Sequence, residues 1–348
     1  MSEANLQRYL TSRHAAAQLG YTVQHTRLLI RNGKLEAAKF GRDWLVARES
    51  VAQYQMTVWE DNAPPKVTLT LGKVVNVASV PQRSPFRYPG GKTWLVPYVR
   101  AWLSNRQARF TDLVEPFAGG GIVSLTAVFE GLVDRAILVE LDADVASVWE
   151  TLLNGDAKWL AEQIAGFDLS RQCIEVALAE SGKSTKHRAF ATILRNRINR
   201  GGILAPGAGR VKNGENGRGL RSRWYPETLR RRIRDIAQLR NKLSFIRGDG
   251  LQILQKNAGR SKTAFFIDPP YTVAGRRLYA HSDIDHEELF RITGSLGGSF
   301  LMTYDDAAEI RRLVQRHRYP FTRVPMKSTH HEKKMELLIT DRLDWLQS

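Results

Sequence analysis

The sequence predicts an α/β protein whose core is a doubly wound, mostly parallel sheet, and two observations lead to this fold class. From Ser84 onward, short apolar runs with the length of buried strands alternate with stretches of helical periodicity. Glycines and acids follow directly after several of these runs, and ligands bind beyond the carboxyl ends of the strands in such sheets. The predicted strands lie in Phe110–Gly121, Arg135–Asp142, Lys242–Gly250, Thr263–Ile267, Gly298–Asp306 and Lys334–Asp341.

Length and composition describe a globular chain of two or three domains. The 348 residues are 43% hydrophobic, which is enough to bury several cores. No stretch is long and apolar enough to span a bilayer, and the first residues lack the apolar core of a signal peptide, so a cytoplasmic protein without membrane contact is expected. Cys173 is the only cysteine, and the eight histidines show no paired metal spacing. We therefore expect neither an internal disulfide nor metal-dependent chemistry.

The chain is strongly basic, and the charge is concentrated in one segment. The formal net charge is +17 and the isoelectric point is about 10.1. Between Arg195 and Lys242 there are 14 Lys and Arg residues and 3 acids. A positive surface can serve solubility alone, but clustered charge favours a nucleic acid partner.

Residues 1–60 predict a small separate module. Thr11–Gly20 and Thr22–Gly33 each start with threonine and end with glycine, the punctuation of short capped helices. Lys34–Ser50 predicts two short strands around a turn, and a last helix begins at about Glu49. This order resembles the helix-turn-helix of the excisionase and MerR-like family, in which the second helix enters the major groove, although some such modules bind proteins. The resemblance implies DNA contacts by Gln24, His25, Arg27 and Arg31.

Two motifs beyond the first two strands of the sheet suggest a nucleoside pocket. The glycines of Glu115–Gly121 let the backbone turn close to a ligand, although an ordinary flexible turn has the same pattern. The segment is neither a P-loop nor a proper dinucleotide fingerprint. Glu140, at the tip of the second strand, can accept both hydroxyl hydrogens of a ribose, or it can be a solvated strand end. The two motifs lie about twenty residues apart, as expected when one nucleoside bridges neighbouring strands.

Three further motifs contain residues suited to binding or catalysis. Phe86–Lys92 reads FRYPGGK, a tight turn whose lysine could bind a carboxylate or phosphate, or could be merely exposed. Asp249 follows the third strand, within reach of an adenine amine. Asp268–Tyr271 reads DPPY and comes directly after an apolar run. By itself DPPY is a tight turn, because proline fixes φ and displaces its predecessor from the helical region.

Taken in order, FxYPGGK, EPFxGxG and DPPY resemble the Dam-like family of DNA adenine-N6 methyltransferases, which use S-adenosylmethionine. The resemblance extends over Ser84–Asp341. Further matching segments are NRINRGGIL (196–204), RWYPETL (223–229), LYAHSDIDHEEL (278–289), TYDD (303–306) and the closing ELLIT. It implies a Rossmann-like catalytic domain in residues 85–150 and 243–348, with a target-recognition region inserted at 151–242. Family members as a rule lack a module like the amino-terminal one, which residues 61–84 would link to the rest.

The resemblance assigns roles to the matching positions. Glu140 would bind the ribose of S-adenosylmethionine and Asp249 its adenine. The methionine end would contact Tyr88, Gly90, Gly91 and Lys92. The pocket would be lined by Glu115, Pro116, Phe117, Ala118, Gly119, Gly120 and Gly121. The reaction centre, which also borders the cofactor through Asp268, would be Asp268, Pro269, Pro270 and Tyr271.

The chemistry at adenine N6 explains why those last four residues are suitable. The amine is a poor nucleophile because its lone pair is delocalised, and two acceptors directed at its protons would localise the pair and stabilise the developing positive charge. The Asp268 carboxylate and the Pro269 carbonyl can be those acceptors, and the prolines fix their direction. Tyr271 offers a ring for the target base, which must leave the duplex to be reached. The methyl donor is already activated, so no metal or covalent intermediate is required.

The insertion carries most of the predicted contacts to double-stranded DNA. Leu229–Asp235, LRRRIRD, looks like a basic helix face, and Arg200–Arg223 should be a long loop or hairpin. Several of these arginines could equally form a solvated positive surface. Those expected along phosphates, with one or two at guanine edges, are Arg197, Arg200, Arg210, Arg221 and Arg223.

The function that these motifs favour is site-specific adenine methylation of DNA in restriction–modification or in phage or host DNA modification, with a restriction endonuclease as a candidate partner. Two alternatives stay open. The chain could be a transcriptional regulator whose methylase fold is only a scaffold, though the intact Asp268–Tyr271 favours an enzyme. It could also methylate RNA or a protein amide, though related enzymes for such substrates usually carry Asn at the position of Asp268.

Overall fold

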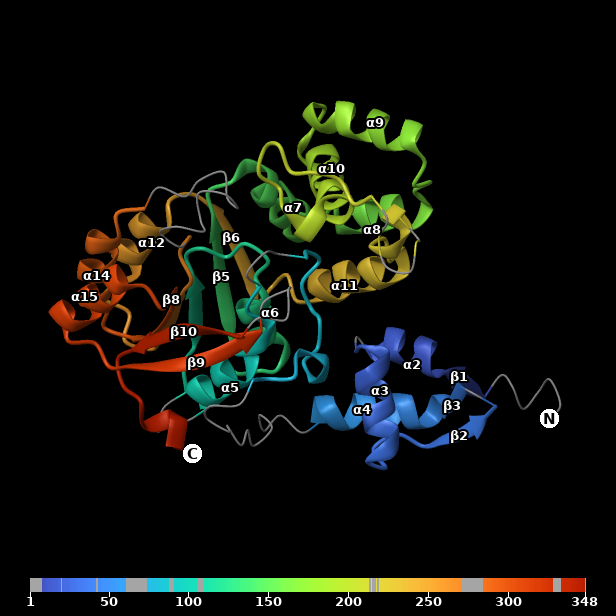
Figure 1. The fold of residues 1–348 in the computed structure, drawn as a ribbon, viewed down its shortest axis with the longest axis horizontal. Coiled ribbons are helices and arrows are strands. Elements are labelled where there is room, and N and C mark those ends of the chain that lie inside the picture. Colours follow the sequence, from blue (N-terminus) through green and yellow to red (C-terminus); the bar gives the residue numbers. More distant parts are fainter. Residues whose placement is uncertain are drawn as a thin grey trace. The chain divides into compact units, whose positions relative to one another are not determined.

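The computed structural model describes residues 8–19, 21–41, 43–60, 74–87, 91–104, 109–212, 214, 217, 219–270, 284–327 and 333–347. The chain divides into two compact units. One comprises Met1–Lys66 with Asn76–Arg83, and the other comprises Val67–Val75 with Ser84–Ser348. Figure 1 labels the helices and strands of both units.

The first unit is a pair of helices followed by a small sheet and a last helix, as predicted. Its elements are β1 (Tyr9–Thr11), α2 (Ser12–Leu19), α3 (Val23–Arg31), β2 (Ala37–Phe40), β3 (Asp43–Ala47), α4 (Arg48–Glu60) and the 3₁₀ turn η1 (Val77–Ser79). The middle strand, β3, is antiparallel to both β1 and β2. The prediction omits β1, because three residues show no periodicity of their own and form a strand only by pairing with β3.

Capping and burial define the second helix, α3. Thr22 Oγ1 accepts a hydrogen bond from the backbone N–H of His25 (3.1 Å), and Gly33 adopts φ +67° beyond the helix end. The core of the unit consists of Leu10, Ala15, Leu29, Ile30, Leu35, Val46 and Val51. Leu28, although apolar, is not part of this core and is 42% exposed. It shares the outward face of the helix with Gln24, four residues earlier.

The second unit is built on a seven-stranded sheet with the order β6-β5-β4-β7-β8-β10-β9. The strands are β4 (Asp112–Glu115), β5 (Arg135–Glu140), β6 (Leu243–Arg247), β7 (Thr263–Ile267), β8 (Ser299–Asp305), β9 (Phe321–Lys327) and β10 (Lys333–Thr340). β4 to β8 run parallel, whereas β10 is antiparallel to both of its neighbours. The predicted mostly parallel sheet is confirmed. The reversed β10 brings its amino end to the edge at which the parallel strands end.

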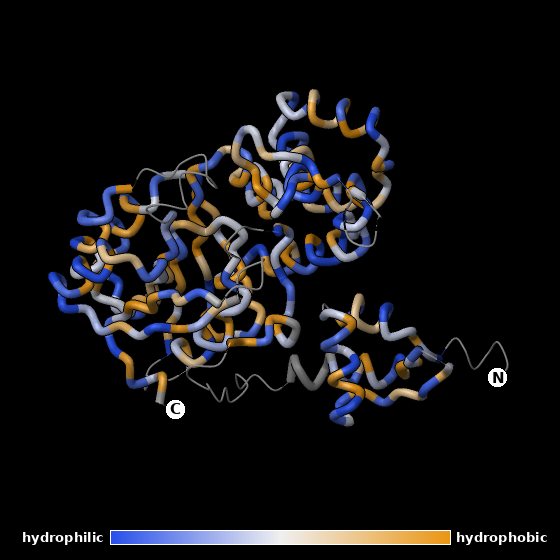
Figure 2. The backbone as a smooth tube through the Cα atoms, in the orientation of Figure 1, coloured by the Kyte–Doolittle hydropathy of each residue, from blue (hydrophilic) through white to orange (hydrophobic). Residues whose placement is uncertain are grey.

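Helices cover both faces of this sheet (Figure 1). The covering helices are α5 (Val96–Ser104), α6 (Ile122–Phe129), α7 (Ala143–Leu153), α12 (Gly250–Asn257), α14 (His286–Thr293) and α15 (Ala308–His317). α12, α14 and α15 share one apolar core with alternate strand residues such as Val114, Phe265 and Met302. α6 and α7 contact β4 to β6, and α5 packs on α6. Figure 2 shows hydrophobic residues concentrated in the centre of this unit, as burial on both faces requires.

Within the seven-stranded sheet, β9 is the strand that the sequence does not predict. Its residues, FTRVPMK, mix polar and apolar side chains instead of forming an apolar run, and they include Pro325. Proline cannot donate a ladder hydrogen bond and therefore argues against a central strand. β9 lies at the edge of the sheet and pairs only with β10, where Pro325 is opposite Met335.

Residues 151–242, between β5 and β6, are mostly helical. The elements are α8 (Ala157–Gly166), α9 (Arg171–Ala179), η3 (Glu180–Gly182), α10 (Thr185–Ile198), η4 (Arg200–Gly202), η6 (Gly219–Ser222) and α11 (Pro226–Gln238). α11 packs on α8, and α10 packs on α7. Within the loop or hairpin predicted at 200–223, Arg210 forms an isolated antiparallel bridge with Asn199. Among the described helices, none is long and apolar enough to cross a membrane.

Candidate active site

Asp268 lies where β7 ends, and two other segments hold its carboxylate. Lys92 Nζ is 3.0 Å from Asp268 Oδ1, and Thr303 Oγ1 donates a hydrogen bond of 2.6 Å to the same oxygen. Lys92 begins the 3₁₀ turn η2 (Lys92–Leu95) and is 4% exposed, so its charge needs a partner within the protein. The direction of the carboxylate is therefore fixed. Pro269 and Pro270 restrict the backbone that follows.

The ammonium of Lys92 lies between two carboxylates. Its Nζ is also 3.6 Å from Glu336 Oε2, and Glu336 is buried near the start of β10, opposite Asp305 of β8. The two acids offset the cost of burying the amine. Thr303 and Glu336 lie in the TYDD and ELLIT segments, but the sequence alone predicts no role for either residue. The signal it lacks is the reversal of β10, since a parallel ELLIT strand would put its other end at this edge.

The glycine turn after β4 packs tightly against its own unit. Gly121 has φ +60°, and a Cβ there would lie 2.7 Å from side-chain atoms of Leu138 and Trp149. Trp149 Nε1 donates a hydrogen bond to the carbonyl of Gly119 (2.9 Å), and Gly119 N–H donates to Glu140 Oε2 (3.1 Å). Packing alone therefore requires glycine at position 121. The same turn places a backbone N–H on the acid at the tip of β5.

Glu115, the last residue of β4, is 3% exposed and accepts a hydrogen bond from the backbone N–H of Ser124 (2.9 Å). Burial raises the pKa of Glu115 to about 8. Hydrogen bonds from Ser124 act in the opposite direction, and the negative charge of Asp268 adds to the rise. Near neutral pH the side chain is therefore largely protonated, which avoids a second negative charge beside Asp268.

Glu115→Gln is expected to flatten the pH dependence of stability. The folded-state pKa of about 8 lies above the ordinary value of 4.5, so the folded chain holds a proton that the unfolded chain releases. The resulting stabilisation is full below pH 4.5 and is lost as the pH rises to about 8. Its slope is at most ~1.4 kcal/mol per pH unit. Urea titrations of wild type and variant across this range measure the difference, and parallel curves would contradict the raised pKa.

Glu140, at the end of β5, is held by backbone N–H groups. Its Oε1 accepts hydrogen bonds from Leu141 N (2.9 Å) and Asp142 N (3.0 Å), in addition to the bond between Oε2 and Gly119. Burial raises the pKa of Glu140 to about 7, while these bonds favour the ionised form. A carboxylate oxygen can accept more than one hydrogen bond, so two hydroxyl groups of a ligand could still donate to Glu140.

Asp249 follows β6 and caps α12. Its Oδ1 accepts hydrogen bonds from Leu251 N (2.7 Å) and Gln252 N (3.3 Å). A Cβ on Gly250 would lie 2.5 Å from the carbonyl oxygen of Pro116, so the turn after β6 lies directly against the turn after β4. The ends of β4, β5 and β6 therefore border one region. Its carboxylates fit a nucleoside with free hydroxyls and an exocyclic amine.

The structure describes only some of the remaining predicted site residues. Tyr88, Gly90 and Tyr271 lie outside the described residues. Gly91 is the exposed residue before η2. In the turn after β4, Ala118 N–H donates to the carbonyl of Val139 (2.9 Å), which ties the turn to β5. The structure thus brings Lys92, Glu115 and Asp268 together, with Glu140 and Asp249 at the same edge of the sheet.

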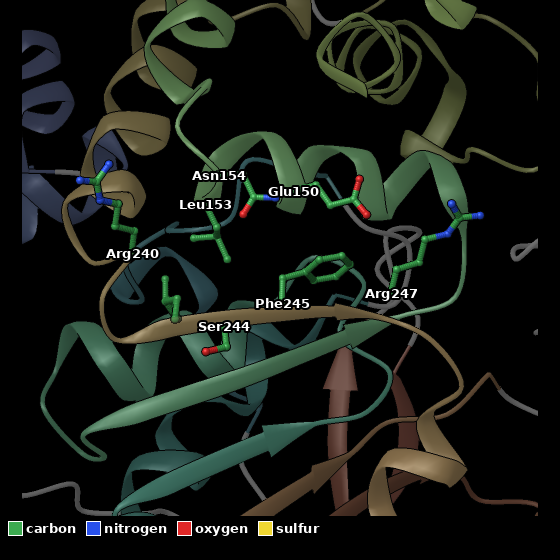
Figure 3. Close-up of a pocket in the computed structure, with 8 residues that line it drawn as sticks. Glu150, Leu153, Asn154, Arg240, Ser244, Phe245 and Arg247 are labelled. Atoms are coloured by element: carbon green, nitrogen blue, oxygen red, sulfur yellow. The ribbon is translucent and has the colours of Figure 1, made fainter. Parts of the chain in front are cut away.

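A cavity of about 410 Å³ between α7 and β6 is a separate feature (Figure 3). It is lined by Glu150, Leu153, Asn154, Arg240, Leu243, Ser244, Phe245 and Arg247. It follows β6, the edge strand of the sheet, and contains none of the predicted site residues. It is therefore not part of the candidate site.

Family comparisons agree with this geometry. Residues 88–334 match the D12 class of N6 adenine-specific DNA methyltransferases. The chain belongs to this family. Residues 9–57 match a helix-turn-helix domain, which confirms the predicted amino-terminal module. No curated protein sequence matches this D12-class methyltransferase significantly.

Two solved structures resemble the D12-class chain distantly. A candidate RNA methyltransferase from Pyrococcus horikoshii shares 10% identity over 71% of this chain and 81% of its own, with a TM-score of 0.33. An rRNA methyltransferase from Streptomyces viridochromogenes shares 14% identity over 71% of this chain and 84% of its own, with a TM-score of 0.31. At these TM-scores the likeness carries no argument about the substrate.

Buried side chains of the insertion hold the segment that leads to Lys92 in this D12-class chain. The Asn196 amide makes two hydrogen bonds with the backbone of Arg87, accepting from its N–H (2.8 Å) and donating to its carbonyl (3.1 Å). Arg197 Nη2 donates to the carbonyl of Pro85 (2.6 Å), and Arg232 Nη1 donates to that of Ser84 (3.0 Å). Asn196 begins the NRINRGGIL segment, but the sequence alone predicts no role for it.

Two expectations about basic residues need correction. Arg197, predicted to lie along phosphates, is 4% exposed and bonded to the backbone, so it is not a surface arginine. LRRRIRD is helical but is not an open basic face. Arg230 and Arg234 pair with Glu162 of α8 at 3.7 and 2.5 Å, because this side of α11 packs on α8.

The other predicted DNA contacts differ in their surroundings. Arg210 pairs with Glu175 (2.7 Å), and both side chains are exposed. Arg200 and Arg221 are exposed and form no ion pair with a described residue, whereas Arg223 is half-buried. On α3, the side chains of Gln24 and Arg31 are exposed, and those of His25 and Arg27 are half-buried. Contact with DNA stays a prediction for each of them.

Proposed function

We propose that this methyltransferase transfers a methyl group from S-adenosylmethionine to N6 of an adenine in duplex DNA. One observation carries the proposal: in a chain of an adenine-N6 family, the Asp268 carboxylate is anchored by Lys92 and Thr303 where β7 ends. The carbonyl of Pro269 follows directly. A fixed carboxylate beside a fixed carbonyl can hold both protons of an exocyclic amine.

The ends of β4, β5 and β6 support a site for the cofactor. S-adenosylmethionine supplies a methyl group that is already activated by a positively charged sulfur. Glu140 would accept the ribose hydroxyls, Asp249 would accept the adenine amine, and Glu115–Gly121 would border the pocket. Lys92 was expected at the methionine end, but its two carboxylate partners favour a role in anchoring Asp268.

The residues around Asp268 would act on the target amine rather than on the methyl donor. Asp268 and the Pro269 carbonyl would accept hydrogen bonds from the two amine protons, which localises the lone pair and stabilises the charge that develops. Tyr271 would stack on a base extruded from the duplex. The extra proton on nitrogen would leave after methyl transfer, through water. Orientation is thus the main contribution of the protein.

Competition among substrates tests the proposal. Duplex DNA, RNA and peptides are mixed with the protein and radiolabelled S-adenosylmethionine, and the labelled product is identified after hydrolysis. We expect the label on N6 of deoxyadenosine. Label mainly on RNA or on a side-chain amide would overturn the proposal. Sequencing of DNA from cells that express the chain would identify the modified site, and a match to the site of an endonuclease would support restriction–modification.

The helix-turn-helix unit favours a second candidate function, transcriptional regulation with the methylase fold as a scaffold. We assign residues 1–60 to this unit, 61–84 to a linker, 85–150 and 243–348 to catalysis, and 151–242 to target recognition. The anchored Asp268 argues for an active enzyme, because a protein that uses this fold only as a scaffold does not require a fixed carboxylate at this position. We therefore propose that α3 adds a DNA contact to the methyltransferase.

Replacing both Gln24 and Arg31 with alanine is expected to weaken DNA binding roughly tenfold and to reduce its salt dependence. Both side chains are exposed on α3, so the fold should be retained. Fluorescence anisotropy with duplex DNA at several salt concentrations measures the change. Arg312→Ala, at an exposed position of α15, controls for loss of one charge. If the double variant bound DNA with wild-type affinity, the proposed DNA contact by α3 would be wrong.

A further inference from the structure

A cavity of about 430 Å³ between the end of α10 and the following segment has a strongly cationic lining. It is lined by Arg87, Arg197, Asn199, Arg200, Gly201, Val211, Lys212, Gly214 and Arg223. Most of these residues are cationic or polar, and none of those described is acidic. A cavity lined in this way attracts an anion.

Arg197 supplies a buried positive charge to this cavity. Its side chain is 4% exposed, and its Nη2 donates to the carbonyl of Pro85 (2.6 Å). Its Nε is buried and has no hydrogen-bond partner among the described residues. The pKa of Arg197 is lowered to about 9, mainly by burial and also by the positive charges of Arg232 and Arg87. A cation buried beside other cations is costly, and an anion in the cavity would offset that cost.

The cations of this cavity differ from other arginines of the insertion. Elsewhere the pairs are Arg195 with Asp144 (2.8 Å), Arg210 with Glu175 (2.7 Å) and Arg234 with Glu162 (2.5 Å). Arg200 and Lys212, which are exposed, form no ion pair with any described residue. The charges of Arg200 and Lys212 are therefore not neutralised by an acid among the described residues.

The cavity lies close to the reaction centre along the chain. Arg87 lines it, and Lys92, five residues later, holds Asp268. Five residues span at most ~18 Å when fully extended. Successive phosphates of one DNA strand advance by about 3.4 Å along the helix axis. The backbone of Arg87 is therefore at most about five nucleotide rises from that of Lys92, which favours a phosphate on the stretch of strand near the target base.

We propose that this cavity binds one backbone phosphate of the substrate strand, close to the target base. The proposal rests on the proposed action on DNA and adds an anchoring site to it. The exposed Arg200 and Lys212 contact the phosphate oxygens, and the buried Arg197 adds its charge. Because a phosphate carries no base information, the site sets the register of the strand against Asp268 without reading sequence.

The double variant Arg200→Ala, Lys212→Ala tests the anchor in the full chain. Binding to duplex DNA without cofactor is expected to weaken roughly tenfold, equally for methylated-site and unrelated sequences, and the salt slope is expected to fall by about one. The double variant Lys256→Ala, Arg312→Ala, a matched loss of two exposed charges, should change the dissociation constant less than about twofold. An unchanged affinity, or a loss confined to the methylated sequence, would overturn the proposal.

Neutral linkages locate the phosphate. Single methylphosphonates are placed one position at a time along both strands around the methylated adenine. One position should weaken wild-type binding as much as the double variant does and should have no further effect in that variant. Additive losses, or no sensitive position, would show that the cavity takes no substrate phosphate. These readouts measure binding alone, so failure of methyl transfer to DNA would be seen separately and would count against the proposed function.

Discussion

Asp268→Ala is expected to lower the rate of methyl transfer by roughly 10²- to 10³-fold while DNA binding stays near the wild-type level. The carboxylate is held in one direction by Lys92 (3.0 Å) and Thr303 (2.6 Å), and the variant loses an acceptor that stabilises the developing charge on nitrogen. Single-turnover rates with labelled cofactor measure the effect. Anisotropy with the same duplex shows whether binding is retained.

Two further variants separate this role from a structural one. Thr303→Val removes one hydrogen bond to Asp268 but leaves Lys92, so its loss of rate should be much smaller. Lys92→Met should reduce the rate when it is introduced alone and should have little additional effect when it is combined with Asp268→Ala, because Lys92 acts through that carboxylate. A wild-type rate in Asp268→Ala would remove the residue from the reaction centre.

Gly202→Ala is expected to destabilise the second unit by about 3 kcal/mol. Gly202 has φ +77°, and an added Cβ would clash with the carbonyl oxygen of Arg87. That carbonyl is held by Asn196 Nδ2 (3.1 Å), which also donates to the carbonyl of Gly202 (2.7 Å). Relief of the clash must move backbone rather than a flexible side chain. Urea unfolding measures the loss of stability.

Gly201→Ala is the matched control. This neighbour also has a positive φ, +66°, but the nearest atom to an added Cβ is 3.7 Å away on Ile203. Backbone strain alone should cost about 1 kcal/mol there. Gly202→Ala should also slow methyl transfer, because displacement of Arg87 shifts the segment that leads to Lys92. Equal destabilisation by the two substitutions would mean that the clash between an added Cβ at position 202 and the Arg87 carbonyl contributes little to the loss of stability.

Much of the fold follows from the sequence because parallel strands are buried on both faces and therefore form apolar runs. β7 shows this best, since all its residues are buried and it reads TAFFI. The strands absent from the prediction, β1 and β9, owe their conformation to a partner. β1 is three residues long, and β9 contains a proline that only an edge position tolerates.

The sequence likewise reveals some residues of the candidate site and not others. Local motifs mark Lys92, Glu140 and Asp268 because each is an unusual residue at the end of a strand or turn. The groups that hold Asp268 and Lys92 are Thr303 and Glu336. Both lie far away in the chain, and Glu336 is on a reversed strand. Composition counts the charge of an arginine such as Arg197 but does not show whether the fold buries it.

The pairing of Lys92 with Glu336 has a consequence for the order of assembly during translation. β10, which carries Glu336, is the last strand to leave the ribosome, whereas Lys92 precedes every strand of the sheet. A nascent chain can therefore align β4 to β8 before Lys92 gains its contact with Glu336. The final strand then places Glu336 beside Lys92. An incomplete polypeptide can therefore form the parallel part of the sheet before the surroundings of Asp268 are complete.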